Sequence, residues 1–149
     1  MQILEHQSLC LRNLISCQMN LTPEKLPSML QYVLKNASGI GITPSNRILV
    51  TEHPNESENF EILIPIQSKV AHCDSYTYKE QFKLFNAVLI RHEGDFSILE
   101  RTKQRLLEYI TEKKYQAISE PYYSIVRLSP KNPESCIIDI YVSISLNVL

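Results

Sequence analysis

The order of strand-like and helix-like segments repeats once along the chain, and this repeat limits the fold more than any other feature. In each half, one apolar strand precedes a helix and two further strands follow it. A shift of about 78 residues places segment 60–66 on segment 138–144, so that Glu61 coincides with Asp139. The sequence therefore predicts an α+β fold, in which tandem βαββ repeats form one antiparallel sheet with two helices on one face.

The repeat also predicts where each element lies. The first repeat, about 6–68, has strands expected at 9–17, 46–51 and 59–67 and a helix expected at 27–36. The second repeat, about 82–146, has strands expected at 85–92, 122–128 and 136–145 and a helix expected at 97–114. The polar segment at about 69–81 is the expected linker. Because this linker is short, we expect a single domain over 1–149 with both repeats in one sheet.

Composition excludes several functional classes. The 149 residues are 44% apolar and 21% charged, as in ordinary globular domains. The formal net charge of −1 lacks the excess of basic residues that is typical of proteins that bind nucleic acid or anionic lipid. No apolar run is long enough to span a membrane, and the N-terminus does not resemble a signal peptide. The four cysteines form no C-x-x-C pair, which favours reduced thiols and a cytoplasmic location. We expect no direct nucleic-acid or membrane partner.

Strand alternation identifies the candidate binding residues. In the last strand Ile138, Ile140, Val142 and Ile144 share one face, which suits packing under a helix, whereas Asp139 and Tyr141 point to the opposite face. Glu61 has the same position in the first repeat. We expect both carboxylates to face a shared groove where the repeats meet. Aromatic rings beside carboxylates favour cationic or planar ligands, and the candidate set is Glu61, Asp139, Tyr141, Tyr122 and Tyr123.

Plainer interpretations of these residues stay open. Each carboxylate is also compatible with the solvated face of an antiparallel sheet, and each tyrosine with core or edge packing. The tripeptide His72-Cys73-Asp74 has no further His or Cys at ligand spacing, so we assign no metal and no cofactor. His92 is expected at a turn. No Ser-His-Asp or Cys-His arrangement follows from spacing, and no catalytic residue is assigned.

The chain resembles the GyrI-like small-molecule-binding family, which includes effector-binding domains of multidrug-responsive regulators. Segment 88–96 is similar to that family's strand ending in His-x-Gly-x-aromatic, and segment 120–125 to its Gly-Pro-x-x-Glu-x-Tyr strand. Segment 61–66 is similar to its Glu-x-x-x-Pro-Val strand, and segment 139–144 matches it loosely. The resemblance implies a tandem βαββ fold with helices on one sheet face and a ligand groove on the other.

Departures from the family pattern guide the functional prediction. Some members hydrolyse small molecules with a groove glutamate, but Ser124 and Asp139 stand at two positions where the family has Glu. We therefore rank a hydrolase lowest and assign no enzymatic activity. The first prediction is a cytoplasmic small-molecule-binding module with an acidic and aromatic groove for amphipathic or cationic ligands. The alternative is a protein-interaction adaptor that kept the fold and lost ligand binding.

Overall fold

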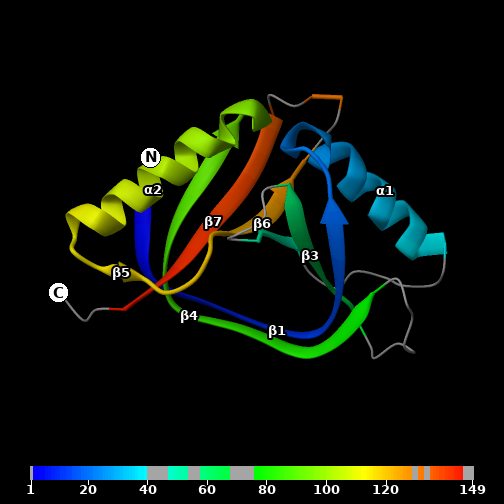
Figure 1. The fold of residues 1–149 in the computed structure, drawn as a ribbon, viewed down its shortest axis with the longest axis horizontal. Coiled ribbons are helices and arrows are strands. Elements are labelled where there is room, and N and C mark those ends of the chain that lie inside the picture. Colours follow the sequence, from blue (N-terminus) through cyan, green and yellow to red (C-terminus); the bar gives the residue numbers. More distant parts are fainter. Residues whose placement is uncertain are drawn as a thin grey trace. The chain divides into compact units, whose positions relative to one another are not determined.

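The predicted α+β class is confirmed. The computed structural model describes residues 2–39, 47–53, 58–67, 76–128, 131–132 and 135–145. Over these residues the seven strands belong to one antiparallel sheet, and the chain has two α-helices (Figure 1). The chain forms two compact units, one made of 1–9 and 83–149 and the other of 10–82. The two long strands β1 (Ile3–Asn20) and β4 (Thr77–Gly94) contribute residues to both units.

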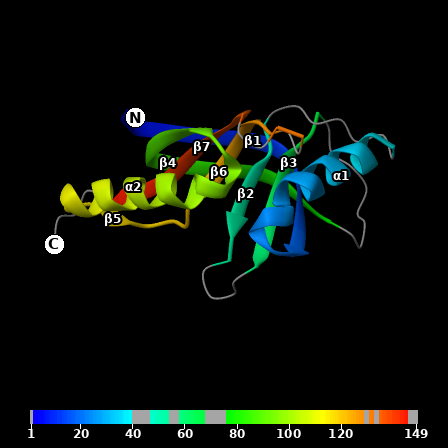
Figure 2. The same ribbon diagram turned by 90° about the horizontal axis from the view of Figure 1, so that it is seen from above.

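The unit of residues 10–82 is built around β3 (Asn59–Pro65), which pairs antiparallel with β1 and with β2 (Leu49–Glu52). A short 3-10 turn, η1 (Pro23–Lys25), leads into α1 (Leu26–Gly39). Pro27 lies in the first turn of α1, where its missing N–H breaks no helical hydrogen bond. Figure 2 shows α1 alongside the strands of its unit, and Leu26 and Leu30 bury its apolar side.

The other unit has β7 (Cys136–Ser145) at its centre, and the bounds of this strand match the prediction. It pairs antiparallel with β4 and with β6 (Tyr122–Arg127), while β5 (Gln116–Ala117) pairs with its end. The short turn η2 (Phe96–Ile98) leads into α2 (Leu99–Glu112). Figure 1 shows α2 alongside β4 and β7.

One apolar core joins α2 to the sheet of this unit. Leu106 and Ile110 pack against side chains from β4 and β7, which are Val88, Ile90, Cys136, Ile138, Ile140, Val142 and Ile144. These side chains are at most 4% exposed. The predicted placement of the alternating isoleucines and valine of β7 under a helix is confirmed. The remaining residues of β7 therefore point to the sheet face that α2 does not cover.

The junction of β4 and α2 is fixed by a buried histidine. His92 is 1% exposed; its Nδ1 lies 2.6 Å from Thr102 Oγ1 of α2, and its Nε2 lies 2.9 Å from the carbonyl oxygen of Asp95. Gly94 has φ 134°, which L-residues rarely adopt, and the Asp95 carboxylate then accepts a hydrogen bond from the Ser97 N–H. Asp95 thus caps the start of η2. The prediction that His92 lies at a turn is wrong, because β4 stays paired with β7 as far as Gly94.

The long strands extend beyond their predicted bounds. β1 begins at Ile3 instead of residue 9, and β4 begins at Thr77, inside the segment predicted as a linker. Backbone pairing needs no apolar side chain, so the polar ends of both strands gave no hydrophobic signal. Both strands also contain residues with positive φ angles, namely His6, Asn13 and Asn86. The segment His72-Cys73-Asp74 lies outside the described residues.

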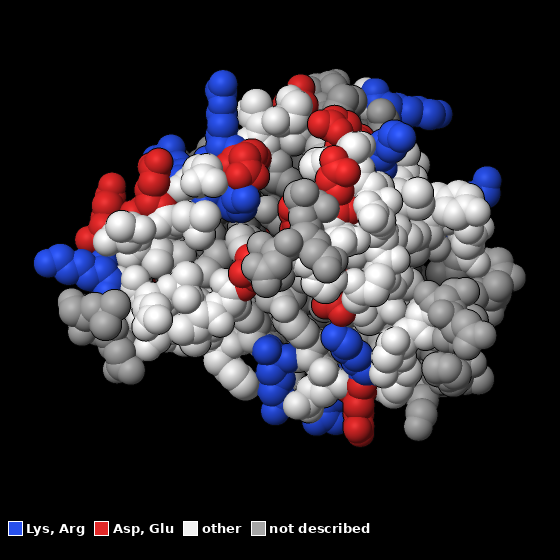
Figure 3. Space-filling model, in the orientation of Figure 1, with Lys and Arg blue, Asp and Glu red and all other residues white. Residues whose placement is uncertain are grey.

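The face of the molecule drawn in Figure 3 has no dominant sign of charge. On the face drawn in Figure 3, basic and acidic side chains of the described residues are interspersed, consistent with the formal net charge of −1. Within the described part of the chain, no helix is both long enough and apolar enough to cross a membrane.

We predict that Leu106→Ala lowers the free energy of unfolding by about 2–5 kcal/mol, because it leaves a cavity in the core beneath α2. Chemical denaturation measures the change, with the exposed Arg105→Ala on the same helix as control. Equal effects of the two substitutions would contradict the packing described for α2.

The histidine junction gives a second prediction. Thr102→Val keeps the shape of the side chain but leaves His92 Nδ1 without its hydroxyl partner, so the free energy of unfolding should fall by about 1–3 kcal/mol. Thr111→Val is the matched control, because Thr111 is exposed and its hydroxyl bonds only within α2; its effect should stay within about 0.5 kcal/mol. A Thr102→Val variant as stable as the control would refute the role of this junction.

Candidate functional site

Asp139 and Tyr141 lie on the sheet face that α2 leaves uncovered. Asp139 is paired across the sheet with Arg91 of β4 and with Ser124 of β6. Tyr141 is paired with Leu89 of β4 and with Tyr122 of β6. Directly opposite residues of an antiparallel pair share a face. These six residues therefore lie on one face of the sheet, which we call the open face because α2 does not cover it. Four of them are nevertheless at most 8% exposed, namely Leu89, Ser124, Asp139 and Tyr141.

An ion pair dominates the open face. The Arg91 guanidinium donates two hydrogen bonds to the Asp139 carboxylate, from Nε to Oδ1 at 2.7 Å and from Nη2 to Oδ2 at 3.0 Å. The Asp139 side chain is only 5% exposed, whereas that of Arg91 is 45% exposed. A buried carboxylate needs such a partner, because an uncompensated buried charge is costly. The pair raises the pKa of Arg91 above its usual value, chiefly through the hydrogen bonds to Asp139.

A cavity of about 510 Å³ lies against this ion pair. Its lining comes from three strands or their ends: Gln2, Leu4, Leu89, Arg91, Glu93 and Asp139. Leu4 and Leu89 supply apolar walls, and the three charged side chains, one basic and two acidic, leave a net charge of minus one at neutral pH. Cavities of roughly 300–1,000 Å³ accommodate small organic ligands. The site therefore combines apolar surface with charges of both signs.

The predicted tyrosines separate into two groups. Tyr122 and Tyr141 are paired on the open face with Asp139. Tyr123 instead aligns with Ile140 and packs against the apolar core under α2. It therefore does not lie with the other two tyrosines. The cause is strand alternation, in which a shift of one position along a strand moves a side chain to the opposite face.

Glu61 lies in the unit of residues 10–82. Its Oε2 accepts hydrogen bonds from the Ser16 hydroxyl at 2.7 Å, from Lys79 Nζ at 3.2 Å and from Gln18 Nε2 at 3.3 Å. Burial raises the pKa of Glu61, but the Ser16 and Lys79 contacts outweigh it, so the pKa lies below its usual value. Glu61 is therefore an ionised, hydrogen-bonded carboxylate. A groove that Glu61 shares with Asp139 stays a prediction.

Sequence reasoning missed most of the cavity lining. Arg91 and Glu93 belong to segment 88–96, and the resemblance of this segment to the family motif predicts no role for either residue. Their position beside Asp139 depends on the register of β4 against β7, which pairs Arg91 with Asp139. Opposite charges at these two positions are a usable signal only once that register is known. Leu4 was missed because β1 extends closer to the N-terminus than its apolar residues indicate.

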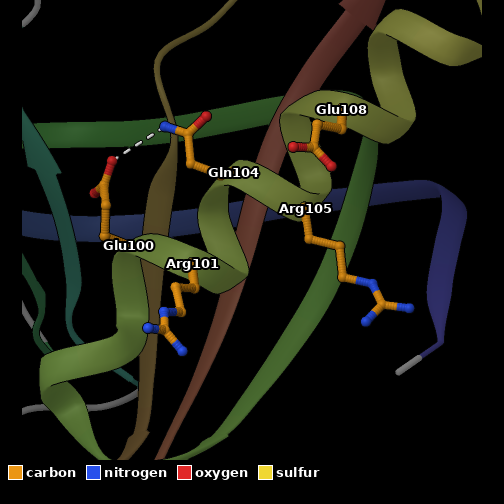
Figure 4. Close-up of a pocket in the computed structure, with 5 residues that line it drawn as sticks. All are labelled: Glu100, Arg101, Gln104, Arg105 and Glu108. Carbon is orange, nitrogen blue, oxygen red and sulfur yellow. Dashed lines mark hydrogen bonds between the residues drawn. The ribbon is translucent and has the colours of Figure 1, made fainter.

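A second hollow, of about 480 Å³, lies on the solvent side of α2. Its lining residues are Glu100, Arg101, Gln104, Arg105 and Glu108. Figure 4 shows Glu100 and Gln104 turned toward one another and joined by a hydrogen bond of 3.1 Å, while Arg101 and Arg105 point elsewhere. Such pairs are ordinary on a solvated helix. Among the described residues, no group of three or more His, Cys, Asp and Glu side chains is placed to hold a metal ion.

Comparison with known proteins identifies the fold of this chain but shows no family. No protein-family model matches the chain, and no curated protein matches it. Solved structures do match. The EcmrR C-terminal domain is 13% identical with a TM-score of 0.65, and the match covers 94% of this chain and 98% of that domain. In an EcmrR–DNA complex the TM-score is 0.76 at 10% identity, and this chain spans 57% of the length of EcmrR.

Two further structures share the fold. A hydrolase from Listeria innocua has a TM-score of 0.61 at 12% identity, over 97% of this chain and 91% of that one. SAV2435, solved bound to tetraphenylphosphonium, has a TM-score of 0.54 at 9% identity. The match covers 97% of this chain and 93% of SAV2435. At such identities the likeness concerns the fold alone. The fold of this chain is that of the EcmrR C-terminal domain and SAV2435, which is consistent with the predicted GyrI-like fold.

Proposed function

We propose that this chain is a small-molecule-binding module whose ligand is amphipathic and carries a positive charge. The observation that carries the proposal is the cavity of about 510 Å³ on the open face, where Leu4 and Leu89 adjoin Asp139, Arg91 and Glu93. Apolar walls with a few charged groups are typical of sites for small ligands, since burial of apolar surface supplies affinity and the charges supply orientation.

The charge of the cavity favours a cation. Two carboxylates and one guanidinium line it, so its net charge attracts positive ligands. Tyr122 and Tyr141 lie on the same face as Asp139 and are proposed ligand contacts through their aromatic rings. Tyr123 is left out of the proposed site, because it packs against the core under α2.

Structural neighbours support the same class of function. SAV2435 shares the fold and was solved with tetraphenylphosphonium, a bulky apolar cation. Its example is a reason to try ligands of that chemistry on this chain. We keep Glu61 as a further proposed contact, because the predicted sequence repeat aligns it with Asp139 and its carboxylate is ionised at neutral pH.

A thermal-shift screen of amphipathic organic cations, including tetraphenylphosphonium, tests the proposal. A ligand at about 100 times its dissociation constant should stabilise the protein by roughly 2.7 kcal/mol, which corresponds to about 5–11 °C in Tm. Glu93→Gln should weaken binding about two- to fivefold, because it removes one cavity carboxylate. Glu108→Gln on the exposed side of α2 is the matched control. No stabilisation by any cation would contradict the proposal and favour the adaptor alternative.

A separate prediction concerns Glu61. If its carboxylate contacts the cation, Glu61→Gln weakens binding about two- to fivefold at pH 7. Because the folded pKa lies below the usual 4.5, more than half of the Glu61 carboxylate is ionised at pH 4.5, and its contribution should fade as the pH falls further. Isothermal titration of both proteins between pH 7 and pH 4 measures this, with the exposed Glu24→Gln as control. Unchanged affinity in Glu61→Gln would remove Glu61 from the site and leave the cavity proposal standing.

A further inference from the structure

We infer that the open-face cavity selects amphipathic zwitterions over simple lipophilic cations, and that Arg91 is the residue that determines this specificity. The favoured ligand has an apolar body, a cationic centre and a carboxylate or comparable acceptor a few ångströms away. This inference rests on the proposed function, since it names the ligand class of the same cavity.

The first argument is that Asp139 is already neutralised. Both of its carboxylate oxygens accept hydrogen bonds from Arg91, and its side chain is 5% exposed. A simple cation that approached Asp139 would meet the adjacent guanidinium charge, which repels it. Asp139 alone is therefore a poor site for a lipophilic cation, in contrast to an unpaired carboxylate on the same face.

The second argument is that Arg91 keeps hydrogen-bonding capacity on the cavity side. A guanidinium carries five N–H groups, and the pair with Asp139 uses two of them, which leaves three for other acceptors. The Arg91 side chain is 45% exposed and lines the cavity. Because Asp139 holds Nε and Nη2, the orientation of the guanidinium is fixed before a ligand arrives. An anionic ligand group then gains charge-assisted hydrogen bonds without a large ordering cost.

The third argument concerns the cationic end of the ligand. Glu93 lies two residues beyond Arg91 on β4, so the two side chains share a side of the strand about 7 Å apart, and both line the cavity. Glu93 is exposed. The raised pKa of Arg91 comes chiefly from its hydrogen bonds to Asp139, and the nearby charge of Glu93 adds a smaller contribution. A ligand with both charges matches this pair, whereas a simple cation matches only Glu93.

A matched pair of probes tests the inference. Pentyltriphenylphosphonium and (4-carboxybutyl)triphenylphosphonium share the same apolar cationic body, and only the second carries a carboxylate at its chain end. Isothermal titration at pH 7 should show the carboxylate compound binding at least about tenfold more tightly, as expected for a hydrogen-bonded charge pair. The methyl ester of the carboxylate compound should bind like the pentyl compound, because it lacks the negative charge.

Variants assign the preference to Arg91. Arg91→Met removes the guanidinium and should reduce the preference for the carboxylate compound to twofold or less. Since this variant leaves Asp139 buried without its partner, the double variant Arg91→Met with Asp139→Asn provides the same test with no uncompensated charge. Arg101→Met on the exposed side of α2 is the matched control and should keep the tenfold preference.

The outcomes separate the two proposals. Equal binding of both probes to the unmodified protein would overturn the zwitterion inference and leave the proposed cation-binding function intact. A preference that survives in the double variant would overturn the role of Arg91. Binding of neither probe, together with no response to any cation in the thermal-shift screen, would overturn the proposed function itself.

Discussion

The packing of α2 against β4 and β7 determines which side chains of this unit lie on the opposite face of the sheet. Once Ile138, Ile140 and Val142 are buried under the helix, the two-residue alternation of the strand puts Asp139 and Tyr141 on the opposite face. The same constraint applies to the neighbouring strands, so Arg91 faces Asp139 and Tyr122 faces Tyr141. The arrangement of polar residues on the open face is thus a consequence of the apolar core. A change of strand register would disrupt the core and this arrangement together.

A buried carboxylate on that face then requires a fixed cation. Arg91 meets the requirement with two hydrogen bonds, and its remaining exposure places a preoriented positive group at the edge of a cavity. The ion pair therefore compensates the buried charge of Asp139 and, under the proposed function, also contributes to ligand recognition. Burying Asp139 with a partner leaves Arg91 and Glu93 as the charges that a ligand can reach most easily.

The sequence allowed much of the fold to be predicted, and the reasons are physical. Apolar alternation in 136–145 and helical spacing in 97–114 follow directly from burial, and both elements lie where they were expected. The ends of β1 and β4 were not predictable, because their pairing depends on backbone hydrogen bonds instead of apolar side chains. At the site, the shared face of Asp139 and Tyr141 followed from strand alternation, whereas the position of Arg91 required the strand register. The core packing of Tyr123 likewise depends on the register of β6 against β7.

Chemical-shift mapping by NMR tests the central claim most directly. Titration with (4-carboxybutyl)triphenylphosphonium should move the amide resonances of residues around the open-face cavity, above all Leu4, Leu89, Arg91 and Glu93. The amides on the solvent side of α2, such as Arg101 and Arg105, should stay unchanged. Shifts confined to α2, or shifts scattered over the surface with none at the cavity, would contradict the account.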